Sequence, residues 1–256
     1  MVFDGGSGLR PLRSATRVVA VWLGLCALLV APAGADAQSR SRRAPVRPVV
    51  VELFTAQGCA SCPQANQMLA EIAQRRGIVA LTWPVDYWDY LGWPDTFAKP
   101  EFTSRQRAYV SRLMLKEIYT PEVVVSGRTE APAVEREDVD EVIEADAARR
   151  QRGPAISFSR QGRRVTVGSG TSLRGGVDVW LVRYDPARRD VRVRTGENAG
   201  KTVTHVNVVR ELTRLGPWSG RMRSYPAAAP VAPGLTTLVL VQGAKGGPIL
   251  AAAKDG

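Results

Sequence analysis

The sequence predicts an α/β domain followed by a smaller antiparallel β-sandwich-like domain. The first is indicated by two apolar strands that flank a helical stretch within residues 49–85, because two strands joined by a helix form a parallel pair with a right-handed crossover. The second is indicated by short alternating segments beyond Gly153-Pro154, separated by turns and with almost no helical periodicity. The chain has 256 residues, which is enough for two domains of average size.

The first 37 residues have the pattern of a cleaved secretory leader. Arginines precede an apolar run over residues 18–30, which is shorter than a membrane-spanning helix needs, and Ala35-Asp36-Ala37 has the form of a leader-peptidase site. The alternative is an uncleaved membrane anchor, which the short apolar run disfavours. We therefore expect residues 1–37 to be removed and residues 38–48 to form a flexible tether. The mature protein would be periplasmic or secreted, without stable membrane insertion.

The α/β domain, residues 49–152, is predicted from apolar runs and the turn signals between them. The first strand is a continuous β-branched run, as expected of a strand covered on both faces. Proline in the first turn and glycine after the last turn bound the first helix. The expected elements are strands at 49–54, 78–85, 122–126 and near 129, and helices at 63–76, 102–118 and 135–150.

The second domain, residues 153–256, is predicted to consist mainly of strands. The expected strands are 155–160, 164–168, 177–184, 191–195, 203–212, 236–241 and 248–253. This half has no cysteine, one histidine and scattered carboxylates, so we expect an accessory domain that docks against the first and has little chemistry of its own. Glu197 and Asn198 are candidates to hydrogen-bond a neighbouring loop, and Trp218 is a candidate interface anchor.

Cys59-Ala60-Ser61-Cys62 lies between the first predicted strand and helix. Cys26 would leave with the leader, so the mature protein would hold only these two cysteines. A disulfide that closes so short a loop restrains an unfolded chain little, which favours chemistry over a structural staple. The unpaired N–H groups and dipole of a helix start stabilise a thiolate, so Cys59 is the expected nucleophile and Cys62 the resolving thiol. No cofactor is expected beyond this redox-active disulfide.

A C-x-x-C between a strand and a helix resembles the site of thioredoxin-like domains. In such domains a cis-proline opens the third core strand beside the cysteines. Only about 5–6% of X-Pro bonds are cis in general, so a trans proline is the ordinary alternative. The position of Thr120-Pro121 before a Val-Val-Val strand predicts a cis bond. Pro121 would belong to the site, and Thr120 would help to bind substrate through strand-like backbone hydrogen bonds.

Glu52 is a carboxylate in an otherwise apolar strand, seven positions before Cys59. It has two interpretations. It could relay a proton for Cys62 as a general acid and base. Alternatively, it could be a strand residue whose carboxylate pairs with an arginine near the end of the sheet.

An aromatic, turn-rich segment over residues 86–100 follows the second predicted strand. Its aromatic residues near the strand end are Tyr87, Trp88, Tyr90 and Trp93. They could form a wall beside the cysteines, with Asp86 or Asp89 as a polar anchor, in which case Tyr87, Trp88 and Trp93 would bind substrate. The alternative is a packed loop that covers the sheet end. Arg105 and Gln106 are expected to brace this loop by hydrogen bonds.

The composition bears on metals and on nucleic acid. His205 is the only histidine, so a closed four-ligand zinc site is nearly excluded and a hydrogen-bonded structural role is the first expectation. The alternative is a soft-metal site for copper made by Cys59, Cys62 and His205. The net charge is +11, but the arginines are scattered and no basic run is interleaved with aromatics. We therefore expect no nucleic-acid partner.

Several motifs together resemble one family of secreted bacterial thioredoxin-like proteins. This family is defined only as a domain of unknown function. The motifs are residues 52–63, 85–93, 102–106 and 119–121, with 196–198, 207 and 247–249 in the second half. The resemblance implies the thioredoxin-like fold and no particular substrate. One departure is Pro84, where the family often has a histidine, so no role of that histidine carries over to this chain.

The sequence therefore predicts a periplasmic thiol–disulfide oxidoreductase that acts on protein or small-molecule thiols and disulfides. The alternative is a non-catalytic envelope binding or copper-handling protein of the same fold. The direction of exchange, the substrate and the oligomeric state do not follow from the sequence, because related dithiols of the same spacing span about −120 to −270 mV.

Overall fold

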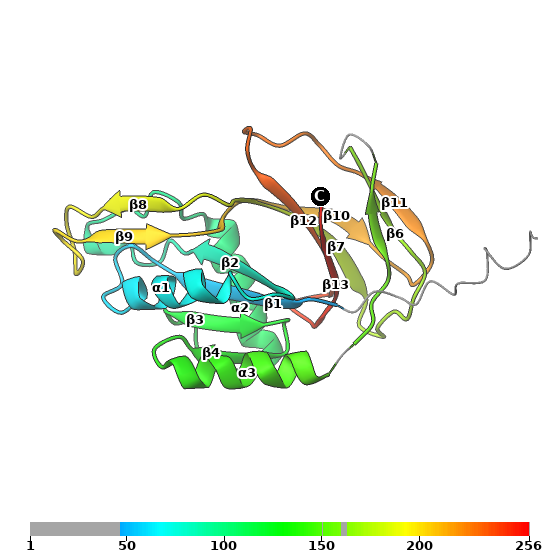
Figure 1. Cartoon of the computed structure of the whole chain (residues 1–256), viewed down its shortest axis with the longest axis horizontal. Helices are drawn as coiled ribbons and strands as arrows, with labels where there is room; N and C mark the ends of the chain where they lie inside the picture. Colours follow the sequence, from blue (N-terminus) through cyan, green and yellow to red (C-terminus); the bar gives the residue numbers. More distant parts are fainter. Residues whose placement is uncertain (1–46, 150, 160–162, 256) are drawn as a thin grey trace, which may run out of the picture. The chain divides into compact units, whose positions relative to one another are not determined.

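The computed structural model describes residues 47–149, 151–159 and 163–255 (Figure 1). These residues belong to one compact unit. The predicted leader, residues 1–37, and nearly all of the predicted tether lie outside the described residues. Within the described part of the chain, no helix is long and apolar enough to cross a membrane.

The fold is mixed α/β, with one large mixed sheet and few helices. The helices are α1 (Cys62–Ile72), the short 3-10 helix η1 (Asp89–Leu91), α2 (Pro100–Leu113) and α3 (Arg136–Ala148). The strands of the large sheet are β1 (Val49–Thr55), β2 (Ile78–Pro84), β3 (Glu122–Val125), β4 (Thr129–Pro132), β7 (Val177–Asp185), β10 (Val208–Pro217), β12 (Thr236–Gly243) and β13 (Ile249–Lys254). Their order across the sheet is β13-β12-β7-β10-β2-β1-β3-β4.

The predicted strand–helix–strand unit is present at the centre of this sheet. Strands β1 and β2 are parallel, and β3 is antiparallel to β1 on its other side. Alternate residues of β1 serve two cores: Val50 and Phe54 pack toward α2, while Val51 and Leu53 pack with residues of α1 and α3. This two-sided burial explains why β1 reads as a continuous apolar run.

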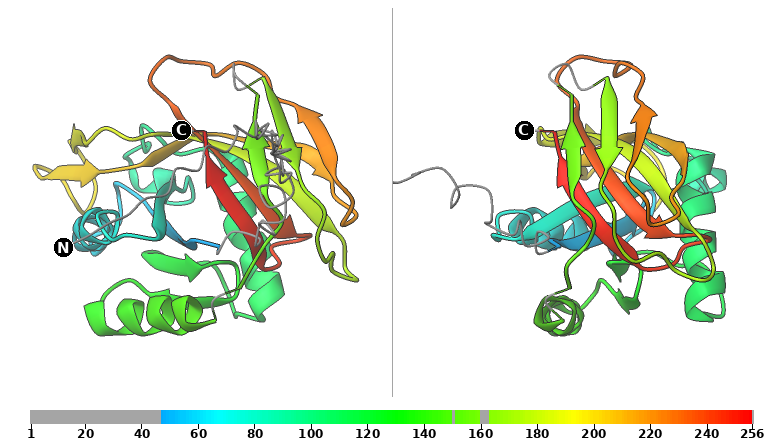
Figure 2. Two further views of the ribbon diagram at one scale, coloured as in Figure 1. Left: turned by 45° about the vertical axis from the view of Figure 1, so that its right-hand side comes forward. Right: turned by 90° about the vertical axis from the view of Figure 1, so that its right-hand side faces the viewer.

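The strands beyond Gly153 join the sheet of the first half. The junction is the pairing of Val208 in β10 with Thr82 in β2, and β10 then pairs antiparallel with β7. Strands β5 (Ile156–Phe158), β6 (Arg164–Val167) and β11 (Arg223–Pro226) form a separate small sheet. It faces the far end of the large sheet across a core of its own, as the two views of Figure 2 allow the reader to follow. Sandwich-like packing is thus present, but one of its two sheets continues into the first half.

Strands β8 (Arg189–Arg192) and β9 (Thr202–His205) form a two-stranded hairpin that leaves this second half. Figure 1 shows the hairpin beside α1, and residues of β9 contact that helix. Trp218 does not reach this interface. It is buried among residues of β6, β7, β11 and β12, so its predicted role as an interface anchor is wrong.

Two element boundaries differ from the predicted ones for a local reason. Helix α2 ends at Leu113 rather than at 118, because Met114 takes a left-handed conformation with φ of 58°. The single strand expected over residues 203–212 is two strands, since Asn207 has φ of 50° between them. Asparagine tolerates this conformation better than most residues, and its side chain donates to the Ala80 carbonyl at 2.9 Å.

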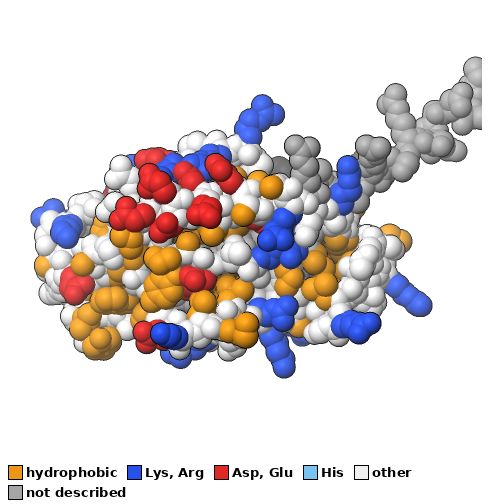
Figure 3. Space-filling view, turned by 90° about the horizontal axis from the view of Figure 1, so that it is seen from below, with side chains coloured by type: hydrophobic (Ala, Val, Ile, Leu, Met, Phe, Trp, Pro, Cys, Tyr) orange, Lys and Arg blue, Asp and Glu red, His pale blue; other side chains and the backbone are white. Residues whose placement is uncertain are grey.

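Charge is unevenly spread over the surface. Helix α3 carries Glu137, Asp138, Glu141 and Glu144 at exposed or half-buried positions. In Figure 3, which views the molecule from the side of this helix, acidic side chains gather in a band along one edge, with some lysine or arginine side chains among them and others scattered over the rest of the face. The protein is therefore basic as a whole, with a net charge of +11, but its surface is acidic along α3.

Candidate functional site

Cys59 and Cys62 form a disulfide in the loop between β1 and α1. The strand ends at Thr55, and the helix begins at Cys62 with Pro63 in its first turn. Cys59 is 1% exposed and Cys62 0% exposed, while Ala60 and Ser61 between them are exposed. The prediction that Cys59 precedes the helix and Cys62 begins it is confirmed.

The tip of the β8–β9 hairpin, residues 193–201, is hydrogen-bonded to this loop. The Asn198 amide donates to the carbonyls of Gln57 at 2.9 Å and of Cys59 at 2.7 Å. The Glu197 carboxylate accepts the backbone N–H of Ala60 at 3.1 Å. The prediction that Glu197 and Asn198 bond a neighbouring loop is confirmed, and that loop is the one that holds the cysteines.

The aromatic segment covers the same loop from another side. The Trp93 indole N–H donates to the Gln57 side chain at 2.9 Å. Trp88 lies next to Gly58, directly before Cys59. Tyr87 and Trp88 are half-buried against the core that contains both cysteines, whereas Tyr90 is 82% exposed. Tyr87 and Trp88 therefore lie in the cysteine core, and Tyr90 is not part of any wall.

Acidic side chains hold the aromatic segment in place. Asp86 accepts the Thr103 hydroxyl at 2.5 Å, and Asp89 accepts the backbone N–H of Asp95 at 2.9 Å. Asp95 in turn accepts the backbone N–H of Gln57 at 2.7 Å, two residues before Cys59. Burial raises the pKa of Asp95 to about 6. Both expected anchors, Asp86 and Asp89, bond as predicted.

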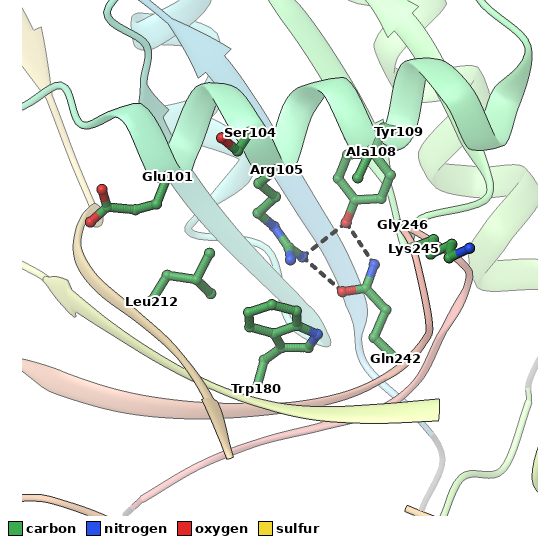
Figure 4. A pocket seen from close by; sticks show the side chains of 10 residues that line it. All are labelled: Glu101, Ser104, Arg105, Ala108, Tyr109, Trp180, Leu212, Gln242, Lys245 and Gly246. Atoms are coloured by element: carbon green, nitrogen blue, oxygen red, sulfur yellow. Dashed lines mark hydrogen bonds between the residues drawn. The ribbon is translucent and has the colours of Figure 1, made fainter. Parts of the chain in front are cut away.

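Arg105 does not brace the aromatic segment, so that expectation is wrong. Its guanidinium donates to the Glu52 carboxylate at 2.7 and 3.0 Å. It also donates to the Gln242 side chain at 3.1 Å, as Figure 4 shows. The Tyr109 hydroxyl donates to the same carboxylate and accepts the Gln242 amide at 2.9 Å. Glu52 thus has the arginine partner of its second interpretation, and no bond from it to either cysteine is formed.

A cavity of about 270 Å³ lies beside this network, lined also by Trp180, Leu212 and Ala108 (Figure 4). Of its polar side chains, Arg105, Tyr109 and Gln242 are bonded to one another or to Glu52, and Ser104 donates to the Pro100 carbonyl. Glu101 and Lys245 also line the cavity.

The Thr120–Pro121 bond is cis, as predicted. Gln106, the second expected brace, hydrogen-bonds Tyr87 of the aromatic segment as expected, and it also donates to the Tyr119 carbonyl at 2.7 Å and to the Glu122 carboxylate at 2.6 Å. Burial raises the pKa of Glu122 to about 7. The side chains of Thr120, Glu122, Gln106 and Tyr87 thus form one polar cluster, in which Tyr87 hydrogen-bonds both Gln106 and Thr120.

His205 has the structural role expected first. Its Nδ1 is 3.2 Å from the Asn66 amide nitrogen, and Asn66 accepts the Thr55 hydroxyl at 2.8 Å. Its ring also packs edge-on against Phe97. Burial lowers the pKa of His205 to about 4, so the ring is neutral at pH 7. The described residues contain no group of three or more His, Cys, Asp or Glu placed to hold a metal.

The family resemblance is confirmed by comparison with known proteins. Residues 50–242 match the model of the family described as protein of unknown function (DUF1223). The chain belongs to this family. No curated protein matches the DUF1223 chain.

Two solved structures resemble the DUF1223 chain. A crystal structure of an Agrobacterium tumefaciens protein is 27% identical, with a TM-score of 0.66, and the match covers 82% of this chain and 94% of that one. HBP35 of Porphyromonas gingivalis is 13% identical, with a TM-score of 0.52 and 82% and 75% coverage. The second likeness concerns the fold alone.

Several residues around the cysteines were not identified from the sequence. Gln57, Asn66, Asp95 and Glu122 are all buried and hydrogen-bonded. Only Glu122 could have been identified, because it is a charged residue at the start of a valine-rich strand. The others stand in turns or on a helix, where polar residues are ordinary.

Proposed function

We propose that this protein is an exported thiol–disulfide oxidoreductase built on a thioredoxin-like domain. The observation that carries the proposal is the position of the Cys59–Cys62 disulfide, with Cys59 ahead of the first turn of α1 and Cys62 within it. Unpaired backbone N–H groups at a helix start favour a thiolate just ahead of them. The parallel β1–α1–β2 unit, followed by antiparallel β3 and β4, supports the thioredoxin-like assignment.

The proposed reaction starts from the reduced dithiol. The thiolate of Cys59 attacks one sulfur of a substrate disulfide, forms a mixed disulfide and releases one substrate thiolate, which takes up a proton. Cys62, once deprotonated, attacks the sulfur of Cys59, closes the protein disulfide and releases the second substrate thiolate. Two electrons pass from the protein dithiol to the substrate, and the reverse sequence oxidises a substrate dithiol.

The surroundings of the two cysteines support this division of roles. Both are buried, Cys59 at 1% exposed and Cys62 at 0%, but Cys59 is followed directly by the exposed residues Ala60 and Ser61. The Ser61 hydroxyl is 3.7 Å from the Cys59 sulfur. An incoming disulfide would reach Cys59 along the Ala60–Ser61 edge once the hairpin or the aromatic segment moves aside.

The proposed compartment is the periplasm or the exterior. The support is the leader-like pattern of residues 1–37, which lie outside the described part of the chain. Stable disulfides are typical of such oxidising compartments. Protein or small-molecule thiols and disulfides are the proposed substrates.

The experiment is an exchange assay with glutathione disulfide or insulin. We expect the wild-type protein to accelerate exchange and Cys59→Ser to give only the background rate of the small thiols. Glu144→Gln is the control, since it changes an exposed residue of α3, keeps both cysteines and should remain active. A wild-type rate no greater than that of Cys59→Ser would contradict the proposal.

One observation favours the alternative, a non-catalytic envelope binding protein of the same fold. The hairpin and the aromatic segment leave Cys59 only 1% exposed, which is less access than a protein substrate needs. The same assay distinguishes the two functions, because a binding protein would not catalyse exchange with either substrate.

A further inference from the structure

We propose that the carboxylate of Glu197 is a positioning residue that makes the Cys59 thiol less acidic and the Cys59–Cys62 pair more reducing. Glu197 lies 137 positions further along the chain than Ala60, the residue that it contacts. This inference rests on the proposed function only for its redox consequence. The effect on the acidity of Cys59 stands by itself.

The contact is made at the amide next to the nucleophile. The Glu197 carboxylate accepts the N–H of Ala60 at 3.1 Å, and Ala60 directly follows Cys59. The amides around the start of α1 are the donors that would stabilise a thiolate. Glu197 uses one of these donors and adds a negative charge nearby. Both effects disfavour a second negative charge on the Cys59 sulfur.

The carboxylate is held in place although its own side chain is exposed. The next residue, Asn198, is 0% exposed and donates to the carbonyls of Gln57 and Cys59. On the other side, the Thr195 hydroxyl donates to the Gly92 carbonyl at 2.6 Å. Glu197 therefore sits between two anchored residues of one tight turn. The hydrogen bonds of these neighbours fix the backbone of Glu197, and the bond to the Ala60 N–H then orients its carboxylate.

Other charged or titratable groups also lie near the cysteine loop and must be separated from Glu197. On the described elements packed around the loop they are Arg194 and Lys201 of the hairpin, Asp95 and Tyr87 of the aromatic segment, and His205 of β9. The Lys201 ammonium is 3.0 Å from the Asn198 side-chain oxygen and opposes the effect of Glu197. All of these groups are common to the wild type and to a variant of Glu197, so the comparison of the two isolates one charge.

The size of the effect follows from an exposed charge pair. Two unit charges about 6 Å apart in a dielectric close to that of water shift a pKa by about half a unit, and we take this as the expected size for the exposed Glu197 carboxylate. Removing the charge should therefore raise the thiolate fraction of Cys59 about threefold below its pKa. A threefold change in the equilibrium constant of thiol–disulfide exchange would make the reduction potential of the Cys59–Cys62 pair about 14 mV less negative.

The experiment measures the pH dependence of alkylation of Cys59 in the fully reduced, full-length protein. Iodoacetamide is the probe, and peptide mass mapping separates Cys59 from Cys62. Glu197→Gln removes the charge but keeps an oxygen that can accept the Ala60 N–H. Glu144→Gln is the matched control, an exposed carboxylate on α3. We expect the pKa of Cys59 to fall by about half a unit in Glu197→Gln and to stay unchanged in the control.

A salt titration separates charge from structure. The difference between wild type and Glu197→Gln should shrink in about 0.5 M NaCl, because the Debye length falls to a few ångströms. An unchanged pKa in Glu197→Gln, or a difference that persists in high salt, would overturn the inference. Neither readout needs turnover, so a failure here is distinct from a failure of the exchange assay.

Discussion

Replacing Arg105 by methionine is expected to destabilise the protein by about 3–5 kcal/mol. The Glu52 carboxylate is 0% exposed, and its salt bridge to Arg105 measures 2.7 Å. Without the guanidinium, this charge would stay in the core between β1 and α2, where the Tyr109 hydroxyl is its one remaining donor among the described residues. The Arg105 side chain also packs over the Trp83 ring at 4.8 Å, and methionine replaces part of that contact.

The measurement is urea unfolding followed by tryptophan fluorescence. Arg112→Met is the control, because Arg112 is an exposed arginine of the same helix and should change stability little. The double variant Glu52→Gln/Arg105→Met removes both charges and should be more stable than Arg105→Met alone. Two results would contradict this description of Glu52 as a buried charge. One is a free energy of unfolding for Arg105→Met within about 1 kcal/mol of the wild-type value. The other is a double variant that is no more stable than Arg105→Met.

Replacing Asn198 by alanine is expected to release the hairpin from the cysteine loop. The side-chain amide makes two bonds to backbone carbonyls, at 2.9 and 2.7 Å, and all three residues are buried. A buried acceptor left without its donor costs about 1–3 kcal/mol. The Cys59 carbonyl keeps the Cys62 N–H as a second donor, so the loss should be about 1–3 kcal/mol, mainly from the Gln57 carbonyl. Since 1.4 kcal/mol is tenfold in an equilibrium constant, the open state of the hairpin should become roughly tenfold more populated.

Two readouts follow from that opening. The reduced Asn198→Ala protein should be alkylated at Cys59 faster than wild type, and its urea midpoint should fall. Arg192→Ala is the control, an exposed residue of β8 in the same hairpin. Unchanged alkylation in a folded Asn198→Ala protein would mean that the hairpin does not control access to Cys59.

The sequence predicts the parts of this site that depend on neighbours in the chain. The C-x-x-C between a strand and a helix and the strand–helix–strand unit were expected from local patterns. The cis bond before Pro121 was expected from the resemblance to thioredoxin-like domains. Glu197 and Asn198 were also recognised as hydrogen-bonding candidates of a turn. Their partner, the loop around Cys59, was not, because nothing in a glycine-rich turn specifies what it will contact.

The long-range pairings could not be predicted from the sequence. The junction of β10 with β2 depends on Val208 meeting Thr82, and either strand alone resembles an ordinary apolar run. Glu52 could be recognised as a buried carboxylate, but nothing in the sequence specified Arg105 as its partner, 53 positions away. The break at Asn207 was missed because the residues on both sides of it continue the alternating pattern of one strand.

The proposed oxidoreductase function requires Cys59 to be the nucleophile of a dithiol exchange. Cys62→Ser removes the resolving thiol, so the mixed disulfide at Cys59 should persist. We would incubate the reduced variant with glutathione disulfide at neutral pH and detect the adduct by intact and peptide mass spectrometry. If Cys59 is the nucleophile, we expect a stable glutathione adduct on Cys59 in Cys62→Ser and none on Cys62 in Cys59→Ser. An adduct that forms only on Cys62, or no adduct in either variant, would contradict this role of Cys59.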